Sequence, residues 1–232
     1  MFIGPNIVTD GLVLSLDFAS KRSYSGSGTT VNDLSGNDCN LTFNNSPSYS
    51  SNNNGVLQFD GSDEYLESTT NVPTLGSNPR TMMAMFNATT STSGCMFGFG
   101  KNPDGVGGNY KSFELWNYNS ASGLRVHLTG YNLAPGSNYV LANNTNKWIM
   151  ASLHYSSSNL TFRIIDNGTI YTGTGTPTID TSTNCIRINK SAYGSEAGGM
   201  IGKFATFHTY NRDLSESEVL QNYNAIKSRF GL

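Results

Sequence analysis

The sequence predicts an all-β protein, a sandwich of two antiparallel sheets closed by one short C-terminal helix. Three observations lead to this fold class. Short apolar runs recur along the chain with Gly, Asn, Asp and Ser between them, as in strands joined by turns. Several of these runs alternate apolar and polar residues, as strands with one solvated face do. Only the C-terminal stretch repeats its apolar residues at helical spacing.

The C-terminal helix has signals at both of its ends. Ser215 and Glu218 are spaced for a capping box, in which each side chain accepts a hydrogen bond from the backbone N–H of the other residue. Leu214 and Val219 are spaced for a hydrophobic staple, and Gly231 supplies the stop. We therefore expect a helix over about 215–229 that packs on the sandwich.

The first part of the chain contains strand-like runs separated by polar segments. The run 12–18 follows a turn at Asp10-Gly11, and 40–44 is a second candidate strand. Between them, the loop-like segment 20–35 runs into a turn at 32–37. After a Ser- and Asn-rich stretch at 46–55, the runs 56–59 and 64–67 flank Asp60-Gly61. This arrangement predicts a β-hairpin.

The rest of the chain predicts further strands and no internal helix. Within 160–164 the apolar residues Leu160, Phe162 and Ile164 occupy every second position, as on a sheet with one solvated face. Asp166-Asn167-Gly168 predicts a tight hairpin turn, since Asn-Gly readily adopts positive φ. No boundary divides the strands, so we expect one domain over 1–232. The candidate strands are 81–86, 95–99, 112–116, 124–128, 148–155, 160–166, 169–172, 185–188 and 203–210.

Composition excludes several classes of function. Charged residues make up 13% of the chain and the formal net charge is −2, which argues against nucleic acid as a partner because such binding needs clustered Lys and Arg. No apolar run is long enough for a membrane helix, so we expect no membrane insertion. The start lacks the basic and apolar regions of a signal peptide. Cys39, Cys95 and Cys185 fit neither a zinc site nor an even set of disulfides, which predicts buried free thiols.

Four segments, in order, resemble a known group of proteins. They are 11–17, 33–37, 57–66 and 202–218, the last running from Gly-Lys-Phe through Tyr-Asn-Arg-Asp-Leu into the capping box. Together they resemble laminin G-like modules of the concanavalin A-like lectin class. The resemblance implies a two-sheet jelly-roll sandwich over the whole chain. It does not imply one function, because such folds occur in lectins, glycosidases, adhesion modules and virion proteins alike.

A further resemblance concerns context. The spacing between 23–30 and 32–37, together with the closing helix, is similar to modules in structural proteins of tailed bacteriophages. This implies a virion structural protein, a capsid decoration or a fibre or appendage module, made in the host cytoplasm and exposed on the particle surface. Its expected partners are other virion proteins, a second copy of itself and host-surface glycans. A free carbohydrate-binding lectin is the alternative, and a glycoside-acting enzyme with an atypical site is the third.

Aromatic and amide side chains gather between 110 and 131, which is suitable chemistry for a sugar site. Such a site needs an aromatic ring for the apolar face of the sugar and polar partners for its hydroxyls. The alternative is that Trp116, like Trp148, is a core residue beneath the sheets. The carbohydrate-binding candidates are Trp116, Tyr118, Tyr131 and Tyr110.

The laminin G-like resemblance also implies Ca²⁺ as a candidate ion, bound by loop carboxylates and carbonyl oxygens at one rim. The alternative for Asp60 is that Asp60-Gly61 only makes a turn. The candidate ligands are Asp17, Asp60, Asp63 and Glu64.

Catalytic motifs are not evident in the sequence. Glu114 has no carboxylate two or four residues further on, and Asp63 and Glu64 are adjacent, so a strand would point them to opposite faces. His127, His154 and His208 each fall inside a candidate strand, where a structural imidazole is the simpler interpretation. From these observations we expect that the chain is not an enzyme.

Overall fold

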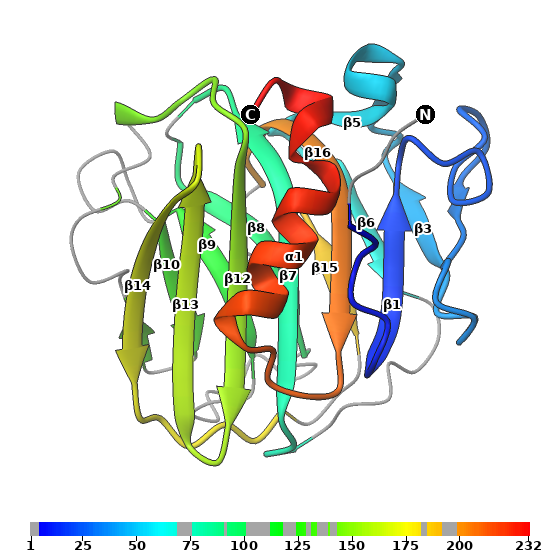
Figure 1. Cartoon of the computed structure of the whole chain (residues 1–232). Coiled ribbons are helices and arrows are strands. Elements are labelled where there is room, and N and C mark those ends of the chain that lie inside the picture. The colour runs from blue at the N-terminus through cyan, green and yellow to red at the C-terminus, as the bar shows by residue number, and fades with distance from the viewer. Residues whose placement is uncertain are drawn as a thin grey trace.

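The computed structural model is a β-sandwich with one C-terminal helix, as the sequence predicts (Figure 1). It describes residues 5–68, 76–90, 92–100, 112–117, 124–128, 131–133, 139, 143–181, 185–191 and 199–232. Over these residues the chain forms two sheets, each of eight strands, and every strand pair within them is antiparallel. The predicted fold class is therefore confirmed.

Sheet A lies beneath the helix in Figure 1 and has the order β14-β13-β12-β7-β16-β5-β4, with β1 also pairing to β16. β16 contacts β5 through its first half and β1 through its second half, so β1 and β5 follow one another along the same edge of β16. The strands of sheet A are β1 (Leu12–Asp17), β4 (Ser48–Ser50), β5 (Val56–Asp60), β7 (Arg80–Ala88), β12 (Ile149–Ser156), β13 (Asn159–Asp166), β14 (Thr169–Gly175) and β16 (Ile201–Tyr210).

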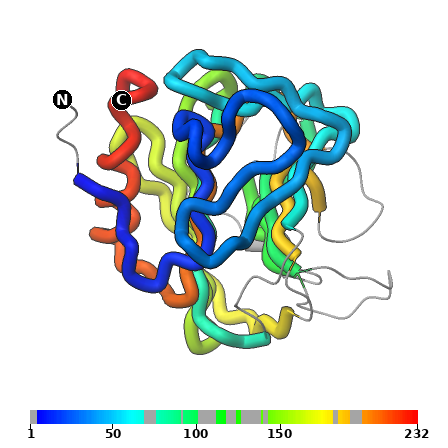
Figure 2. The backbone as a smooth tube through the Cα atoms, turned by 90° about the vertical axis from the view of Figure 1, so that its right-hand side faces the viewer, coloured from blue at the N-terminus to red at the C-terminus, as the bar shows by residue number. Residues whose placement is uncertain are grey.

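Sheet B forms the second layer, with the order β11-β10-β9-β8-β15-β6-β3-β2. Figure 2 shows the C-terminal helix in red on one side of the molecule and the green strands of sheet B on the other. The strands of sheet B are β2 (Thr30–Val31), β3 (Leu41–Asn44), β6 (Tyr65–Ser68), β8 (Gly94–Phe99), β9 (Phe113–Asn117), β10 (Leu124–Leu128), β11 (Tyr131–Leu133) and β15 (Ile186–Ile188).

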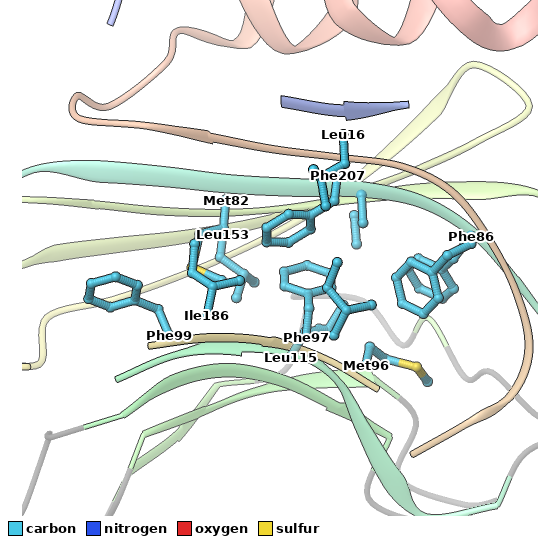
Figure 3. Close-up of a cluster of buried hydrophobic side chains, with 14 of the residues drawn as sticks. Leu16, Met82, Phe86, Met96, Phe97, Phe99, Leu115, Leu153, Ile186 and Phe207 are labelled. Atoms are coloured by element: carbon cyan, nitrogen blue, oxygen red, sulfur yellow. The ribbon is translucent and has the colours of Figure 1, made fainter. Parts of the chain in front are cut away.

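The main hydrophobic core fills the space between the two sheets (Figure 3). Phe86 and Phe207 project into it from sheet A, and Phe97 and Leu115 project from sheet B. The rings of Phe97 and Phe207 meet edge to face, with centroids 5.4 Å apart. Because alternate residues of each strand enter this core, the remaining residues of sheet B point to its outer face.

The C-terminal helix α1 (Glu216–Ile226) covers the outer face of sheet A and continues into the 3₁₀ turn η3 (Lys227–Phe230). Its first turn contains the predicted capping box between Ser215 and Glu218. Val219, Tyr223 and Ile226 pack with side chains of β7, β12 and β13 in a second apolar cluster. That cluster includes Met83, Met85, Met150 and Ile165, so both faces of sheet A are buried.

The predicted hairpin between 56 and 67 is wrong. β5 and β6 are strands as expected, but β5 pairs with β4 and β16 in sheet A, whereas β6 pairs with β3 and β15 in sheet B. The turn at 61–64 therefore carries the chain from one sheet to the other. Gly61 has φ +83°, and a Cβ there would lie 2.4 Å from Ile201 Cγ1. A tight turn signal fixes the turn but not the sheet to which each flanking strand belongs.

Asp166-Asn167-Gly168 does form the predicted hairpin, which joins β13 to β14 with positive φ at Asn167 and Gly168. The thiols of Cys39 and Cys95 are buried and that of Cys185 is half-buried, and none forms a disulfide. Within the described part of the chain, no helix has both the length and the apolar character needed to cross a membrane.

Candidate functional site

A row of residue positions crosses sheet B from strand to strand and carries the chemistry of its outer face. Glu67 on β6 is paired with Arg187 on β15, which is paired with Gly98 on β8, and Gly98 is paired with Glu114 on β9. The row continues through the backbone of β10 and β11. The two carboxylates and the guanidinium come from strands that are far apart in the sequence, and only the sheet register brings them together.

Alternation along β9 places its polar residues on this outer face. Phe113 and Leu115 enter the core, so Glu114 and Trp116 point away from it. Glu114 is completely buried and Trp116 is half-buried. Trp116 is therefore not a core residue beneath the sheets, because its ring lies on the side of sheet B that faces away from the sandwich interior.

Three donors from the described part of the chain hold the Glu114 carboxylate. The indole Nε1 of Trp116 donates to Glu114 Oε2, the hydroxyl of Ser191 donates to the same oxygen at 3.2 Å, and Cys95 Sγ approaches it at 3.9 Å. Burial raises the pKa of the Cys95 thiol well above its ordinary value, and the neighbouring Glu114 raises it further. Cys95 is thus a protonated thiol that can donate to the carboxylate.

Arg187 links the two carboxylates of the row. Its Nε donates to Glu67 Oε2 at 2.7 Å, and its Nη1 donates to the Ser191 carbonyl oxygen at 2.8 Å. The Arg187 side chain is only 8% exposed. Because the Ser191 hydroxyl donates to Glu114, a continuous chain of hydrogen bonds runs from β6 to β9. We call the residues Glu67, Arg187, Ser191, Glu114 and Trp116 the Glu114 network.

Aromatic and cationic groups lie along the same face. Tyr65, two residues before Glu67 on β6, is half-buried, with the Lys190 ammonium 4.5 Å and the Arg187 guanidinium 5.8 Å from its ring centroid. Both contacts fall within the range of cation–π attraction. The outer face of sheet B therefore combines two half-buried aromatic rings with fixed carboxylate, guanidinium and hydroxyl groups, a combination that suits a polyhydroxylated ligand.

Only one of the four predicted carbohydrate-binding residues can be placed fully. Trp116 lies in the Glu114 network. Tyr131 begins β11, the edge strand next to β10, and its backbone pairs with Leu128, but its side chain lies outside the described residues. Tyr110 and Tyr118 also lie outside the described residues. Trp148 is on the other sheet, where it packs against the cluster under α1.

The predicted calcium ligands fall in two places. Asp17 ends β1 and forms an ion pair with Arg229, with Nη1 at 2.8 Å from Oδ1. Asp60 ends β5, and its backbone N–H donates to Glu64 Oε2 at 2.8 Å. Along β16, Asp17 is opposite Thr206 and Asp60 is opposite Ile201, a separation of about 16 Å at the usual strand rise. The structure therefore does not bring Asp17 to the other three.

Glu64 and Asp63 lie in the turn after β5 and not on a strand. Burial raises the pKa of Glu64, and the nearby carboxylates of Asp60 and Asp63 add to the rise. The turn interpretation of Asp60-Gly61 fits this geometry, since Asp60 Oδ1 accepts from the Ser62 N–H at 2.8 Å. Among the described residues, no three His, Cys, Asp or Glu side chains gather closely enough to hold a metal ion.

Two of the three histidines are buried under the helix side of sheet A. His154 contacts Ser152 and Asp213, and His208 contacts Ser15. Burial lowers the pKa of both imidazoles. Each is fully or almost fully enclosed, in keeping with a structural role, and the side chain of His127 lies outside the described residues.

No protein-family model and no curated protein sequence matches the chain. Solved structures do match. Domain 4 of a GH43 extracellular arabinanase from Geobacillus stearothermophilus, in complex with arabinotriose, is 13% identical, with a TM-score of 0.66 over 92% of this chain and 98% of that one. Trypanosoma rangeli sialidase in complex with sialic acid is 14% identical, with a TM-score of 0.66 over 94% of this chain and 33% of that one.

The binding domain of botulinum neurotoxin DC, in complex with SialylT, is 12% identical, with a TM-score of 0.65 over 93% of this chain and 51% of that one. At these identities the likeness shows the fold, a jelly-roll-like β-sandwich. The chain spans about a third of the sialidase and about half of the toxin domain. The matched proteins are named for binding carbohydrates or for acting on glycosides, and none of the three is a phage protein.

These neighbours correct one expectation, namely that the chain is not an enzyme. The sandwich is shared with glycoside hydrolases, among them a sialidase and an arabinofuranosidase. The sequence argument considered only carboxylates paired within one strand. In the structure, Glu67 and Glu114 stand on different strands and share one row through the register of four strands. Spacing within a single strand could not reveal this arrangement.

Proposed function

We propose that the chain is a glycan-binding module and that its ligand lies across the outer face of sheet B. The observation that carries the proposal is the half-buried ring of Trp116, whose N–H is fixed by the buried Glu114 carboxylate. An indole held at one edge loses little freedom when a sugar stacks on it, so less binding energy is lost to ordering. The fold likeness to domains solved with arabinotriose and with sialic acid supports the same class of ligand.

The test is direct binding of oligosaccharides to the purified chain. Arabinotriose and a sialylated oligosaccharide are the first probes, followed by a glycan array with and without a chelator, which tests whether binding depends on a metal ion. Trp116→Ala should weaken binding about tenfold, the loss expected for one stacked aromatic ring. Tyr49→Ala, at a half-buried aromatic residue of β4 on sheet A, is the matched control and should change affinity less than twofold. Equal loss in both variants would count against a site at Trp116.

A second candidate function is cleavage of glycosides, which the fold likeness to a sialidase and an arabinofuranosidase supports. Glycosidases use two carboxyl groups about 5 to 9.5 Å apart. The Cα atoms of Glu67 and Glu114 are three strand spacings apart, about 14 Å, so both side chains must lean toward one another. Glu114 does lean over β8, where only Gly98 leaves room for it.

Turnover of 4-nitrophenyl arabinofuranoside and of an aryl sialoside tests this second function. If Glu114 acts as an acid or base, Glu114→Gln should reduce the rate about a hundredfold or more while oligosaccharide binding persists. A rate that is unchanged in Glu114→Gln and in Glu67→Gln would overturn it.

We also propose where the module is located, namely on the surface of a virus particle. The resemblance to tailed-phage structural proteins favours a virion surface, with other virion proteins, a second copy and host glycans as partners. Mass spectrometry of purified particles, with copy number measured against the major shell protein, tests this location. A stoichiometric signal that survives washing would support it, and absence of the chain from washed particles would overturn it.

A further inference from the structure

A hollow lies on the opposite side of the sandwich from the Glu114 network, where β12 begins and β13 ends. Ile149 and Asp166 are paired at this end of sheet A. The hollow has a volume of about 320 Å³ and is lined by Asn146, Lys147, Trp148, Asp166, Asn167, Phe230 and Leu232. In Figure 1 the C-terminus lies beside the upper end of β12. The residues that line the hollow come from three separate parts of the chain, namely the start of β12, the end of β13 and the C-terminal turn.

Two aromatic rings form the apolar part of this hollow. Trp148 precedes β12, and Phe230 ends η3, with ring centroids 4.3 Å apart and planes inclined by 36°. Both rings are half-buried. A tilted pair that is only partly covered leaves apolar surface for another ring or for the C–H face of a sugar.

The polar part of the hollow is charge-balanced. The Lys147 ammonium lies 3.5 Å from Asp166 Oδ2, and the Tyr139 hydroxyl donates to the same oxygen at 3.1 Å. Burial and the nearby Asp166 raise the pKa of Tyr139, so that its hydroxyl remains a donor. Asn146 and Asn167 are exposed and contribute amides, each able to donate and to accept. Because the two charged side chains that line the hollow, Lys147 and Asp166, pair with each other, the hollow favours a neutral ligand with groups that both donate and accept.

The position of Phe230 is fixed by its neighbour Arg229. Arg229 Nη1 pairs with Asp17 at 2.8 Å, and its Nη2 and Nε donate to the carbonyl oxygens of Gly55 and Asn53. The Asn53 amide donates back to the Arg229 carbonyl oxygen at 3.1 Å. The turn that carries Phe230 is therefore held before any ligand arrives, which reduces the ordering cost of binding.

From these contacts we infer a second carbohydrate site, in which the Trp148–Phe230 hollow binds one or two rings of a neutral sugar. The volume is at the lower end of the range for small-ligand pockets, which fits a ligand of this size. The sugar places its C–H face on the aromatic pair, and its hydroxyls bond to Asp166, Lys147 and the two amides. The inference extends the proposed glycan binding to sheet A, but it uses none of the residues of the Glu114 network.

The chain offers a built-in probe, because Trp116 and Trp148 are its only two tryptophans. Trp116→Phe leaves Trp148 as the sole indole, and Trp148→Phe leaves Trp116. Each single-tryptophan protein is titrated with methyl β-D-galactopyranoside, methyl β-D-glucopyranoside and methyl α-L-arabinofuranoside, up to about 50 mM because single sugars bind weakly. Saturation-transfer NMR on the unaltered chain measures the same binding without relying on fluorescence.

The expected result is a saturable change of Trp148 emission in the Trp116→Phe protein with at least one of these sugars. In that background, Phe230→Ala should weaken binding about tenfold. Asn146→Gly should weaken it about threefold, since it removes the amide while Gly tolerates the φ of +61° found there. The matched control is Phe43→Ala, at a half-buried ring of β3 on sheet B, which should leave Trp148 binding unchanged.

The two proposals fail separately. If only Trp116 responds and Phe230→Ala leaves the NMR signal intact, the second site is overturned and the proposed function stands. If Trp148 responds and Phe230→Ala weakens binding, the second site stands, whatever arabinotriose and the sialylated oligosaccharide show for the sheet B site. If neither tryptophan responds and saturation transfer is absent for all three sugars, the second site is overturned. Thermal melting of each variant separates loss of binding from loss of folding.

Discussion

On the outer face of sheet B, the Glu114 side chain fills the space that a side chain at Gly98 would occupy. The two residues are register partners on β8 and β9, and a Cβ added to Gly98 would lie 2.7 Å from Glu114 Cγ. The glycine is therefore needed for its small size and not for an unusual backbone angle. Glu114 lies over β8 because its partner has no side chain, and from there it reaches Ser191 on the far side.

Substitution of Gly98 should reveal this contact. We expect Gly98→Ala to destabilise the fold by about 1–3 kcal/mol, because the new methyl group must displace a buried side chain. In a Glu114→Ala background the same substitution should cost less than about 0.5 kcal/mol, since the clash is gone. Urea unfolding of the four proteins of this double-mutant cycle measures both values. Equal costs in the two backgrounds would show that Gly98 matters for another reason.

Arg187 should be the most sensitive residue of the Glu114 network. Arg187→Met removes the cation paired with the Glu67 carboxylate and one donor to the Ser191 carbonyl oxygen. The Arg187 side chain is 8% exposed and that of Glu67 is 27% exposed. We expect a loss of about 2–3 kcal/mol, somewhat below the cost of breaking a fully buried pair. Arg187→Lys keeps the charge but not the two-armed geometry, so it should recover part of the loss. Chemical denaturation compares the variants, and an Arg187→Met protein as stable as the parent would contradict the network.

The capping box of α1 gives a prediction of smaller size. Ser215→Ala removes the hydroxyl that accepts from the Glu218 backbone N–H, and it should cost about 1 kcal/mol. Ser228→Ala, at an exposed position in η3, is the control and should change stability by less than about 0.5 kcal/mol. Thermal unfolding of both proteins checks this difference. A loss of similar size in both would assign the effect to helix propensity and not to the cap.

Sequence patterns predicted the elements well where local signals decide the structure. The capping box, the alternation of Leu160, Phe162 and Ile164 and the Asn167-Gly168 turn depend on residues close in sequence. The segment 33–37 combines local contacts with contacts to β1. Asp33 accepts from the backbone N–H groups of Ser15, Ser35 and Cys39, so this part of the resemblance reflects how the loop is fastened to β1.

Pairing between strands far apart in the sequence determines the features that the sequence patterns did not predict. β4 is the polar segment Ser48–Ser50 and is a strand because it pairs with β5, and β11 is only three residues long. The hairpin prediction failed for the same reason, because β5 pairs with β16 and β6 pairs with β15, both of which lie far along the chain. Glu67, Arg187 and Ser191 gave no signal as site residues. They meet Glu114 only through the order β6-β15-β8-β9.

His208 makes stability depend on pH. Burial is the main reason that its pKa falls to about 4, with the Arg229 cation lowering it further and Asp17 opposing the change. Its Nδ1 lies 3.2 Å from Ser15 Oγ. The unfolded chain binds a proton on this imidazole below about pH 6.5, whereas the folded chain does not until about pH 4. Between these values the unfolded state holds more protons, so the free energy of unfolding falls as the pH falls.

Replacing His208 by Asn keeps a group near the position of Nδ1 for Ser15 and removes the titration. At pH 5 the parent should have lost about 2 kcal/mol through this residue relative to pH 7.5, and His208→Asn should lose that much less. The remaining dependence includes His154, whose pKa is also lowered by burial. Urea unfolding at both pH values measures the difference for each protein. If the two proteins lose equal stability on acidification, His208 is either protonated in the folded state or exposed by local opening, and the buried neutral imidazole is not the source of the pH dependence.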